Sequence, residues 1–281
     1  MGNIAIVTDS TADLAEEQYK KNNITVVPLS VIFGEDVYTD DGVALSREEF
    51  YQKLKAAKSL PTTAQPTPED FKKVYEKLLE NNQSIISIHI SRKMSGTMDS
   101  AETAKKALPA GDIEVIDSEM TTMALGLLVL KAAEMAAEGK SKEALLDTIQ
   151  DIKSKTTTLF IPHSLEYLQK GGRIGRAKGL IASLLEIKPL LTLSEGEVSQ
   201  FKNTRRWNQA KTEMLETMQG KVRNGEKLMI AVADADLQDE GDAFADRVKE
   251  TFNPKFIMRT SIGCVVGTHL GPAIAVAFYE E

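Results

Sequence analysis

The chain has 281 residues and a formal net charge of −7, with 42% hydrophobic and 27% charged residues. This composition is typical of a globular protein with one large or two modest domains. The acidic balance argues against a protein that holds nucleic acid by general phosphate neutralisation. The single cysteine, Cys264, cannot form an intrachain disulfide, and we interpret it as a small buried hydrophobic side chain rather than a reactive thiol.

The first residues, "MGNIAIVTDS", run directly into a strand and lack the basic and apolar regions of a signal peptide. The most apolar helix candidate, residues 123–139, contains Lys131 and Glu134 and is too short to span a bilayer. We therefore expect a cytoplasmic protein with no integral membrane segment.

In the first half of the chain, short apolar runs alternate with helical patterns. The patterns predict strands over residues 3–10, 24–34, 84–90 and 112–118, and helices over 11–23, 46–57, 67–82, 121–139 and 141–156. Ser46 with Glu49 forms a capping box, and Thr67 is a cap followed by Pro68 at the first helical position. This alternation indicates an α/β fold with a mostly parallel sheet, helices on both faces and functional loops at the carboxyl ends of the strands.

The second half has an α+β pattern. It predicts strands over residues 157–163, 190–203, 227–235, 254–263 and 273–280, with "SEGE" as a hairpin turn, and helices over 164–170, 177–186, 206–223 and 237–252. We place a boundary near residue 158, which gives an N-terminal α/β domain, 1–158, and a C-terminal α+β domain, 159–281. A cleft between them is the default ligand site.

Two polar stretches in the first half end at predicted helices. In "VTDSTADL", Asp9 is placed to hold a neighbouring loop, while Ser10 and Thr11 read as helix caps. In "LPTTAQPTPED", three prolines stiffen the segment that carries Thr63 and Gln65. The sequence leaves open whether this segment is a binding loop or a stiff connector.

A third stretch, "SRKMSGT", joins a predicted strand to a predicted helix. A nucleophilic serine in such a turn usually lies in G-x-S-x-G, and the glycines of that motif do not flank Ser95. A phosphate-binding P-loop motif is also absent from the sequence. Hydroxyls and backbone N–H groups at a helix N-terminus suit a small anion such as a carboxylate. We interpret Ser95 as a donor to that anion and Thr97 as a helix cap; simple capping by both remains open.

Basic residues gather in two later segments. Glycines surround Arg173 in "KGGRIGRAK", and Arg205 follows a predicted strand in "KNTRRW". Such segments bind phosphate or an acidic partner surface, or are solvated turns. His269 stands between Gly267 and Gly271, which permit close approach of backbone or ligand. No spacing of histidine, cysteine and carboxylate residues predicts a metal site.

Six stretches in order resemble the DegV family of bacterial fatty-acid-binding proteins. They are "VTDSTADL", "TTAQPTP", "SRKMSGT", "YLQKGGRIG", "IKPLLTLSEGEV" and "GTHLGP". The chain departs from the family pattern at Ala64, where serine is usual, and at Ala273, where glycine is common.

The resemblance implies two α/β domains with a long-chain fatty acid bound between or beneath them. It also implies a role as the acyl-binding subunit of a two-part fatty acid kinase, in which a separate ATP-binding protein phosphorylates the bound carboxylate for phospholipid synthesis. By matching positions, Thr63 and Ser95 hold the carboxylate and His269 lies close to it. Arg173 and Arg205 are then candidates for phosphoryl transfer or for contact with the partner, and the role of Asp9 is the least defined.

We therefore expect a monomeric, non-catalytic protein whose only ligand is the fatty acid, with no cofactor and no metal. Its acyl tail would lie in an apolar tunnel, for which residues 125–137 and 179–191 are candidate linings, although the composition of either segment alone favours ordinary core. The alternative is an acyl hydrolase or transferase in which Ser95 is the nucleophile and His269 the base. A regulatory protein with a lipid ligand is a third possibility.

Overall fold

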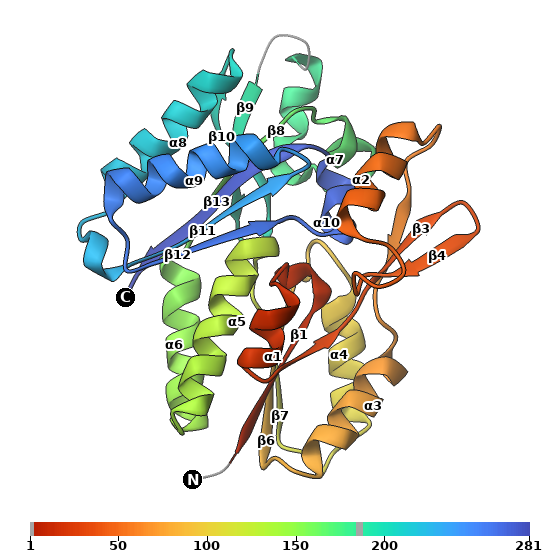
Figure 1. The fold of residues 1–281 in the computed structure, drawn as a ribbon. Coiled ribbons are helices and arrows are strands. Elements are labelled where there is room, and N and C mark those ends of the chain that lie inside the picture. Colours follow the sequence, from red (N-terminus) through yellow and green to blue (C-terminus); the bar gives the residue numbers. More distant parts are fainter. Residues whose placement is uncertain (1–2, 184–187) are drawn as a thin grey trace.

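The computed structural model describes residues 3–183 and 188–281, which fold around three sheets (Figure 1). The first sheet is entirely parallel. Its strand order is β2 (Ile24–Val27), β1 (Ile4–Asp9), β6 (Ser84–His89) and β7 (Ile113–Asp117). The prediction of an α/β fold built on a parallel sheet is confirmed.

The second sheet is antiparallel except where β11 pairs with β12. Its strand order is β10 (Glu197–Thr204), β9 (Lys188–Ser194), β8 (Thr157–Pro162), β13 (Ala273–Glu280), β11 (Leu228–Ala235) and β12 (Phe256–Ser261). Between β9 and β10 the chain turns through Glu195 and Gly196, both with positive φ, so the hairpin predicted from "SEGE" is confirmed.

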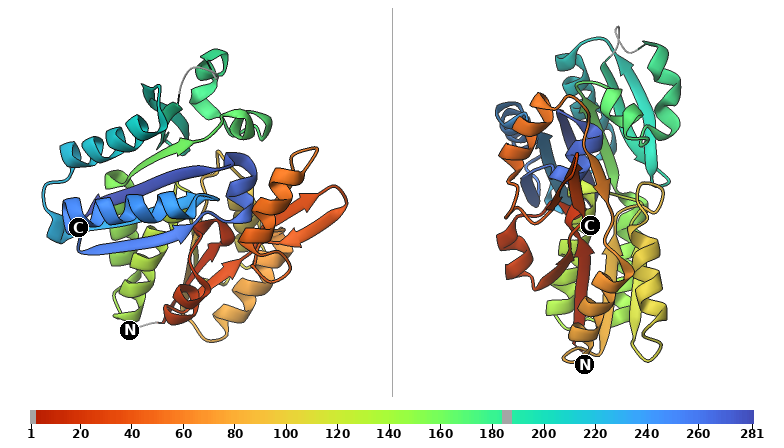
Figure 2. Two further views of the ribbon diagram at one scale, coloured as in Figure 1. Left: turned by 45° about the horizontal axis from the view of Figure 1, so that its top comes forward. Right: turned by 90° about the vertical axis from the view of Figure 1, so that its right-hand side faces the viewer.

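Helices form layers outside and between these two sheets (Figures 1 and 2). α3 (Pro68–Leu79) and α4 (Thr97–Lys106) cover one face of the first sheet. α5 (Thr122–Ala137) and α6 (Lys142–Lys155) lie between the two sheets. α8 (Trp207–Lys221) and α9 (Gln238–Phe252) cover the outer face of the second sheet. The two sheets therefore share one layer of helices.

The close approach of α5 to the second sheet follows from the composition of β11 and β13. Their inner face, which Met229 and Tyr279 continue, carries a run of six alanines: Ala231, Ala233, Ala235, Ala273, Ala275 and Ala277. Isoleucine, valine and phenylalanine alternate with them and pack under α8 and α9. The segment 125–137 is thus core between two sheets, as its composition alone favours, and it does not line the cavity described below.

A small third sheet attaches the first half of the chain to the second. β4 (Asp36–Thr39), β3 (Ser30–Phe33) and β5 (Thr62–Ala64) form it, and α2 (Arg47–Ala56) follows β4 in the chain. Both α2 and this sheet pack against the short helix α10 (Cys264–Leu270). The extended run predicted over 24–34 is thereby divided between two sheets, with Pro28 at the break, and α10 has no counterpart among the predicted elements.

The chain passes from the first sheet and its helices to the second sheet between the end of α6 at Lys155 and the start of β8 at Thr157. The predicted boundary at residue 158 falls inside β8. The segment predicted as a helix over 11–23 consists of a 3-10 turn, Ser10–Ala12, and the helix α1 (Glu16–Lys21). The segment predicted over 177–186 forms 3-10 turns over Gly175–Ser183, after α7 (Glu166–Lys170), and its last residues lie outside the described part.

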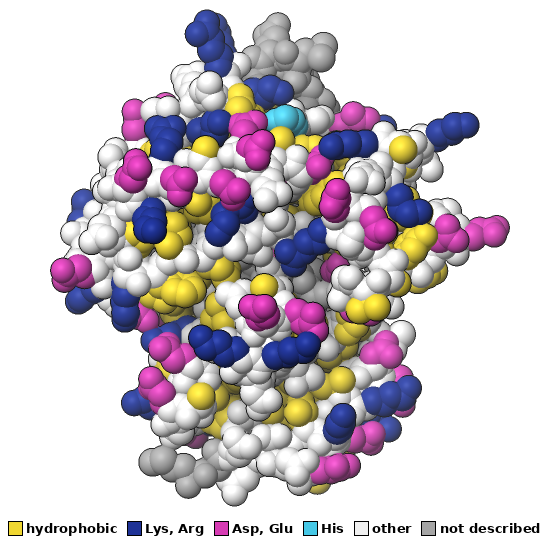
Figure 3. Space-filling view, viewed as in Figure 1, with side chains coloured by type: hydrophobic (Ala, Val, Ile, Leu, Met, Phe, Trp, Pro, Cys, Tyr) yellow, Lys and Arg dark blue, Asp and Glu magenta, His cyan; other side chains and the backbone are white. Residues whose placement is uncertain are grey.

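The surface in Figure 3 carries lysine, arginine, aspartate and glutamate side chains interspersed, without one dominant sign. Over residues 3–183 and 188–281, no helix combines the length and the apolar character that crossing a bilayer requires.

A buried hydrogen-bonded chain fixes the end of β1. Asp9 is fully buried, and its carboxylate accepts hydrogen bonds from the backbone and hydroxyl of Thr11, from His89 Nδ1 at 3.0 Å and from the backbone N–H of Ile90. His89 Nε2 continues the chain to Ser87 Oγ at 2.7 Å, which accepts from the Tyr75 hydroxyl. Asp9 therefore caps the first turn, a role we had assigned to Ser10 and Thr11, and all these polar groups are satisfied.

We predict that Asp9→Ala lowers the free energy of unfolding by roughly 3–5 kcal/mol, because it leaves the donors of Thr11, His89 and Ile90 buried without an acceptor. Urea denaturation followed by circular dichroism measures this. Asp36→Ala, at an exposed position of β4, is the control and should change the midpoint little. A loss no larger than that of the control would contradict the structural role of Asp9.

Candidate functional site

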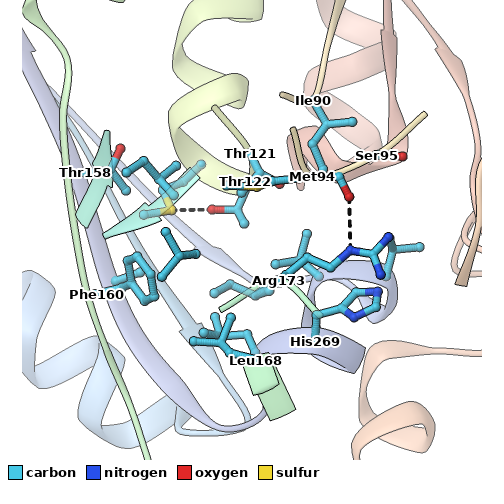
Figure 4. A pocket seen from close by; sticks show the side chains of 18 of the residues that line it. Ile90, Met94, Ser95, Thr121, Thr122, Thr158, Phe160, Leu168, Arg173 and His269 are labelled. Atoms are coloured by element: carbon cyan, nitrogen blue, oxygen red, sulfur yellow. Dashed lines mark hydrogen bonds between the residues drawn. The ribbon is translucent and has the colours of Figure 1, made fainter. Parts of the chain in front are cut away.

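A cavity of about 80 Å³ lies beyond the carboxyl end of β6, between the first and second sheets (Figure 4). Its wall is mostly apolar. The polar side chains that line it are Thr63, Ser95, Thr121, Thr122, Thr158, Arg173 and His269. In Figure 4, Ser95, Arg173 and His269 lie on one side and Thr158 and Phe160 on the other, so the cavity has a polar end and an apolar end.

Thr63 and His269 meet at the polar end, although 206 residues separate them in the chain. Thr63 is on β5 and turns toward the cavity, whereas its neighbours Thr62 and Ala64 are exposed, as strand alternation requires. Its hydroxyl lies 2.9 Å from Nε2 of His269, on α10. Ala64, which departs from the family pattern, therefore does not line the cavity.

Ser95 lies in the turn between β6 and α4, half-buried at the cavity. Its hydroxyl is 2.9 Å from the Thr97 hydroxyl and accepts a weak hydrogen bond from the Thr97 backbone N–H at 3.3 Å. The prediction that Thr97 caps α4 is wrong, because Gly96 occupies the cap position and makes no side-chain bond. Thr97 is instead buried and supports Ser95.

The turn that carries Ser95 packs against the segment that carries Thr63. The amide of Gln65 donates to Ser100 Oγ at 3.2 Å and covers Gly96 so closely that a side chain at residue 96 would overlap it. A glycine is needed here for close approach rather than for an unusual backbone angle. This contact fixes the two hydroxyl-bearing segments relative to one another.

Arg173 joins the third segment of the site. Its Nε donates to the Met94 carbonyl at 3.1 Å, and its Nη1 donates to the Gly171 carbonyl at 2.7 Å. Gly171 lies against the ring of His269, where a side chain would overlap Nδ1. The segments 62–65, 91–97 and 171–173 and the helix α10 therefore close a ring of contacts around the polar end.

Burial, and secondarily the positive charge of Arg173, lower the pKa of His269 to about 4. The imidazole is neutral at pH 7, and its buried Nδ1 has no partner among the described residues. When Nε2 carries the proton, it donates to Thr63 Oγ1, and the Thr63 hydroxyl hydrogen is free to point into the cavity. The site then offers the Thr63 and Ser95 hydroxyls and the Arg173 guanidinium to an anion.

The apolar end is built by residues that the sequence did not single out. Its lining comes from α5, β8, β9, β10, α10 and β13: Met123, Phe160, Leu193, Val198, Val265, Val266 and Ala275. Of the candidate segment 179–191, residues 179–180 and 188–191 do not line the cavity, and the side chains of residues 181–187 lie outside the described part.

Two threonines before and at the start of α5 are further members of the site that the sequence missed. The hydroxyl of Thr121 is buried without a partner in the described part of the chain. Thr122 has a φ of 50°, which is a strained conformation for a β-branched residue. The sequence feature that could have identified them is the Thr-Thr pair that follows the carboxyl end of β7.

Arg205 and Asp9 are not among the residues that line this cavity. Arg205 is exposed before α8, where its backbone N–H donates to Gln209. The expected positive patch around Arg173 is also reduced, because Arg176 pairs with Glu195 and Glu197. Ala273 is a buried strand residue without a positive φ, so this departure leaves the backbone regular.

The arrangement does not form a nucleophile–base pair. Nε2 of His269 is engaged by Thr63, Ser95 Oγ is engaged by Thr97, and no hydrogen bond joins Ser95 to His269 among the described residues. The described residues also contain no group of three or more histidine, cysteine, aspartate or glutamate side chains placed to hold a metal ion. The site has the chemistry of a binding pocket for a molecule with an anionic head and an apolar body.

A family model described as "Uncharacterised protein, DegV family" matches residues 3–281. The chain is 35% identical to a DegV domain-containing protein of Halalkalibacterium halodurans, over the whole of both proteins. It is 32% identical to the protein DegV of Bacillus subtilis, over 96% of each.

Solved structures are also similar. The fatty-acid-binding DegV family protein of Thermus thermophilus superposes with a TM-score of 0.94 at 32% identity, covering 99% of this chain and all of that one. The fatty acid binding protein DegV of Bacillus subtilis gives a TM-score of 0.92 at 31% identity over both whole chains. A stearic-acid-binding protein of Eubacterium ventriosum gives 0.91 at 29% identity, covering 99% and 98% of the two chains.

We predict that His269 makes the protein less stable in acid. Its pKa is about 4 when folded and about 6.5 when unfolded, so the unfolded chain takes up the proton more readily. Stability is full above pH 6.5 and is lost as the pH falls from there toward 4. Between pH 7 and about 4.5, the wild type should lose roughly 2–3 kcal/mol more than His269→Asn.

Urea denaturation of both proteins at each pH provides the test, since every other titrating group is common to the two. An equal loss in both proteins would show that folding does not lower the pKa of His269.

Proposed function

The chain belongs to the DegV family, and on that basis we propose that it binds a long-chain fatty acid whose carboxyl end occupies the cavity between its two main sheets. The cavity of about 80 Å³ admits the head and the first few methylenes, so the apolar wall has to move apart to take up the rest of the tail. The observation that carries this proposal is the joint position of the Thr63, Ser95 and His269 side chains at the polar end of an otherwise apolar cavity. The fatty-acid-binding relatives from Thermus thermophilus and Bacillus subtilis share the fold over the whole chain.

The carboxylate of the acid fits the polar end. A carboxylate that leaves water loses hydrogen bonds, which costs several kcal/mol unless the protein replaces them. The Thr63 and Ser95 hydroxyls replace two, each charged hydrogen bond contributing roughly 1.5–3 kcal/mol. His269 sets the direction of the Thr63 hydroxyl and does not itself bear charge at pH 7.

The tail supplies most of the affinity and the head supplies the orientation. Burial of each methylene contributes about 0.8 kcal/mol. The lining contains two methionines, Met94 and Met123, whose flexible side chains adapt to different tail shapes. Selectivity for chain length therefore resides in the apolar wall and is separable from the head-group contacts.

We further propose that the bound acid is presented to a separate ATP-dependent kinase, which forms an acyl phosphate. This proposal originates in the resemblance of the six sequence stretches to the DegV family. The exposure of Arg173 beside the polar end supports it, because two of the guanidinium nitrogens are held by carbonyls while the side chain remains open to solvent. A phosphoryl group in transit carries negative charge that a fixed guanidinium stabilises.

The hydrolase alternative has less support. It requires a base within hydrogen-bond reach of Ser95, and His269 is directed at Thr63 instead.

We predict that Ser95→Ala and Thr63→Val each weaken palmitate binding roughly 10- to 100-fold, because each removes one charged hydrogen bond. Isothermal titration of the delipidated protein with palmitate and with myristate measures this. The ratio of the two affinities should stay the same in each variant, since the two extra methylenes contact only the apolar wall.

Thr103→Ala is the matched control, because Thr103 lies on the outer face of α4 and bonds only to the Asp99 carbonyl. Native mass spectrometry of the protein purified without added lipid should also detect a bound acid. The proposed function would be refuted if the purified protein carried no acid and bound neither palmitate nor myristate in the titration.

We predict that Arg173→Ala changes palmitate affinity less than about tenfold but slows acyl-phosphate formation more than tenfold with an ATP-binding kinase subunit. The reaction is followed as palmitate-dependent consumption of ATP at saturating palmitate. Arg176→Ala is the control, since Arg176 is a neighbouring arginine that pairs with glutamates outside the cavity. Equal losses of affinity and rate in Arg173→Ala would assign this arginine to binding alone.

A further inference from the structure

A second cleft, of about 880 Å³, lies beside α1 and shares no lining residue with the first cavity. Three segments build most of it: the turn after β1, the loop between β4 and α2, and the start of α10. Its polar lining includes Ser10, Asp13, Tyr19, Asp40, Asp41 and Arg47. The proposed fatty-acid site leaves these residues without a function.

Asp13 is the most unusual residue of this cleft. It is 1% exposed and has a left-handed backbone, with φ of 51°. One carboxylate oxygen, Oδ1, accepts from the Gly263 N–H at 3.0 Å. The other, Oδ2, is buried and has no hydrogen-bond partner within residues 3–183 and 188–281. A buried carboxylate oxygen without a donor costs free energy, so the site lacks a donor that the fold does not provide.

Asp40 brings a second carboxyl group to the same place. Both Oδ1 of Asp13 and Oδ1 of Asp40 lie near Gly263, where a Cβ would be 3.8 Å from the Asp40 oxygen and would overlap that of Asp13. Burial raises the pKa of Asp13 well above its ordinary value, and the nearby Asp40 raises it further. Burial also raises the pKa of Asp40. Two carboxyl groups placed this close ionise together only when positive charge is supplied.

Arg47 faces this pair from the start of α2. Its charge acts on both carboxyls, yet its guanidinium makes no ion pair or hydrogen bond in the part of the chain that the structure describes. Of the other charged side chains in the lining, Lys20 and Glu16 pair with each other at 2.5 Å, and Asp41 is an exposed carboxylate next to Asp40 in the chain. The cleft therefore contains a pair of carboxyl groups, of which Asp13 has an unsatisfied oxygen, and a half-buried guanidinium without a partner among the described residues.

Three kinds of group can satisfy Asp13 Oδ2. A proton would neutralise Asp13 but would leave the Arg47 guanidinium without a counter-ion. A divalent metal is a weaker candidate, because the described residues contain no group of three or more histidine, cysteine, aspartate or glutamate side chains placed to hold one. An ammonium group supplies both the positive charge and several N–H donors. Cys264 is buried and burial raises the pKa of its thiol, so this cleft has no nucleophile.

We propose that this cleft binds a small amino acid-like zwitterion, with its ammonium group on Asp13 and Asp40 and its carboxylate on Arg47. The ligand satisfies the buried oxygen, neutralises the acidic pair and gives Arg47 a counter-ion. A quaternary ammonium group, which has no N–H donor, leaves Asp13 Oδ2 unsatisfied. Recognition of N–H groups, and not of charge alone, is therefore the distinguishing property of the site.

Titration calorimetry of the full-length protein with glycine, β-alanine and 4-aminobutyrate tests the proposal, because the three probes differ only in the distance between their charges. We expect one of them to bind at millimolar concentration or below. Its N-trimethylated counterpart, which has the same charges and no N–H donor, should bind at least about tenfold more weakly.

Asp13→Asn is the main variant, since asparagine tolerates positive φ and its carbonyl still accepts from Gly263. It should weaken the binding of the preferred probe at least about tenfold, as should Asp40→Asn, whereas Asp36→Asn on exposed β4 should not. Arg47→Gln should remove the preference for the amino acid over a simple alkylamine of the same length.

Three outcomes would overturn the proposal: no probe binds, the trimethylated probe binds equally well, or Asp13→Asn and Asp40→Asn bind as the wild type does. Binding of Mg²⁺ that depends on Asp13, without binding of any amino acid, would replace it with a metal site. Palmitate affinity of the same variants shows that they are folded, and it is unaffected in either case because the two cavities have separate linings.

Discussion

The carboxylate of Asp9 is the constraint on which both clefts depend. Four donors from two chain segments converge on this one buried group, so the end of β1 and the end of β6 are held in a single geometry. The segment that leaves β6 continues through Ile90 to the turn with Ser95, and the segment that leaves β1 turns immediately into Asp13. One charged side chain, which reaches neither cavity, thus positions the polar residues of both.

The same network also explains why a Ser–His–Asp sequence of contacts in this protein is not catalytic. Ser87, His89 and Asp9 are connected in the order found in serine hydrolases, but all three are fully buried, and Ser87 accepts a hydrogen bond from Tyr75. A nucleophile needs access to substrate and a base that is free to accept its proton. Hydrogen-bond connectivity without access makes this chain a structural support for the parallel sheet.

Much of the fold could be predicted because its signals are local. Alternating apolar runs, the capping boxes at Ser46 and Thr67, and the Glu195–Gly196 turn each follow from a few adjacent residues. The errors arise where distant residues decide the structure. Pro28 breaks an extended run whose halves join different sheets, and α10 forms against α2, which is more than 200 residues away.

The site shows the same division between local and distant information. No spacing in the chain relates Thr63 to His269, and only the resemblance to a family brought them together. Basic residues in flexible turns looked alike in sequence, yet the folded chain places Arg173 at the cavity and Arg205 elsewhere. The tunnel candidates failed because an apolar helix between two sheets has the same composition as a helix that lines a lipid cavity. Tertiary packing alone separates the two cases.

The close packing of Gly96 under Gln65 and of Gly171 under His269 has a consequence for how such a chain can vary. At each contact, one residue lacks a side chain because another, far away in the sequence, occupies that space. Neither member can change size by itself without moving a wall of the polar end. These pairs are therefore expected to vary together over evolutionary time, so that the head-group end is inherited as a unit, while the apolar wall is free to diverge one residue at a time.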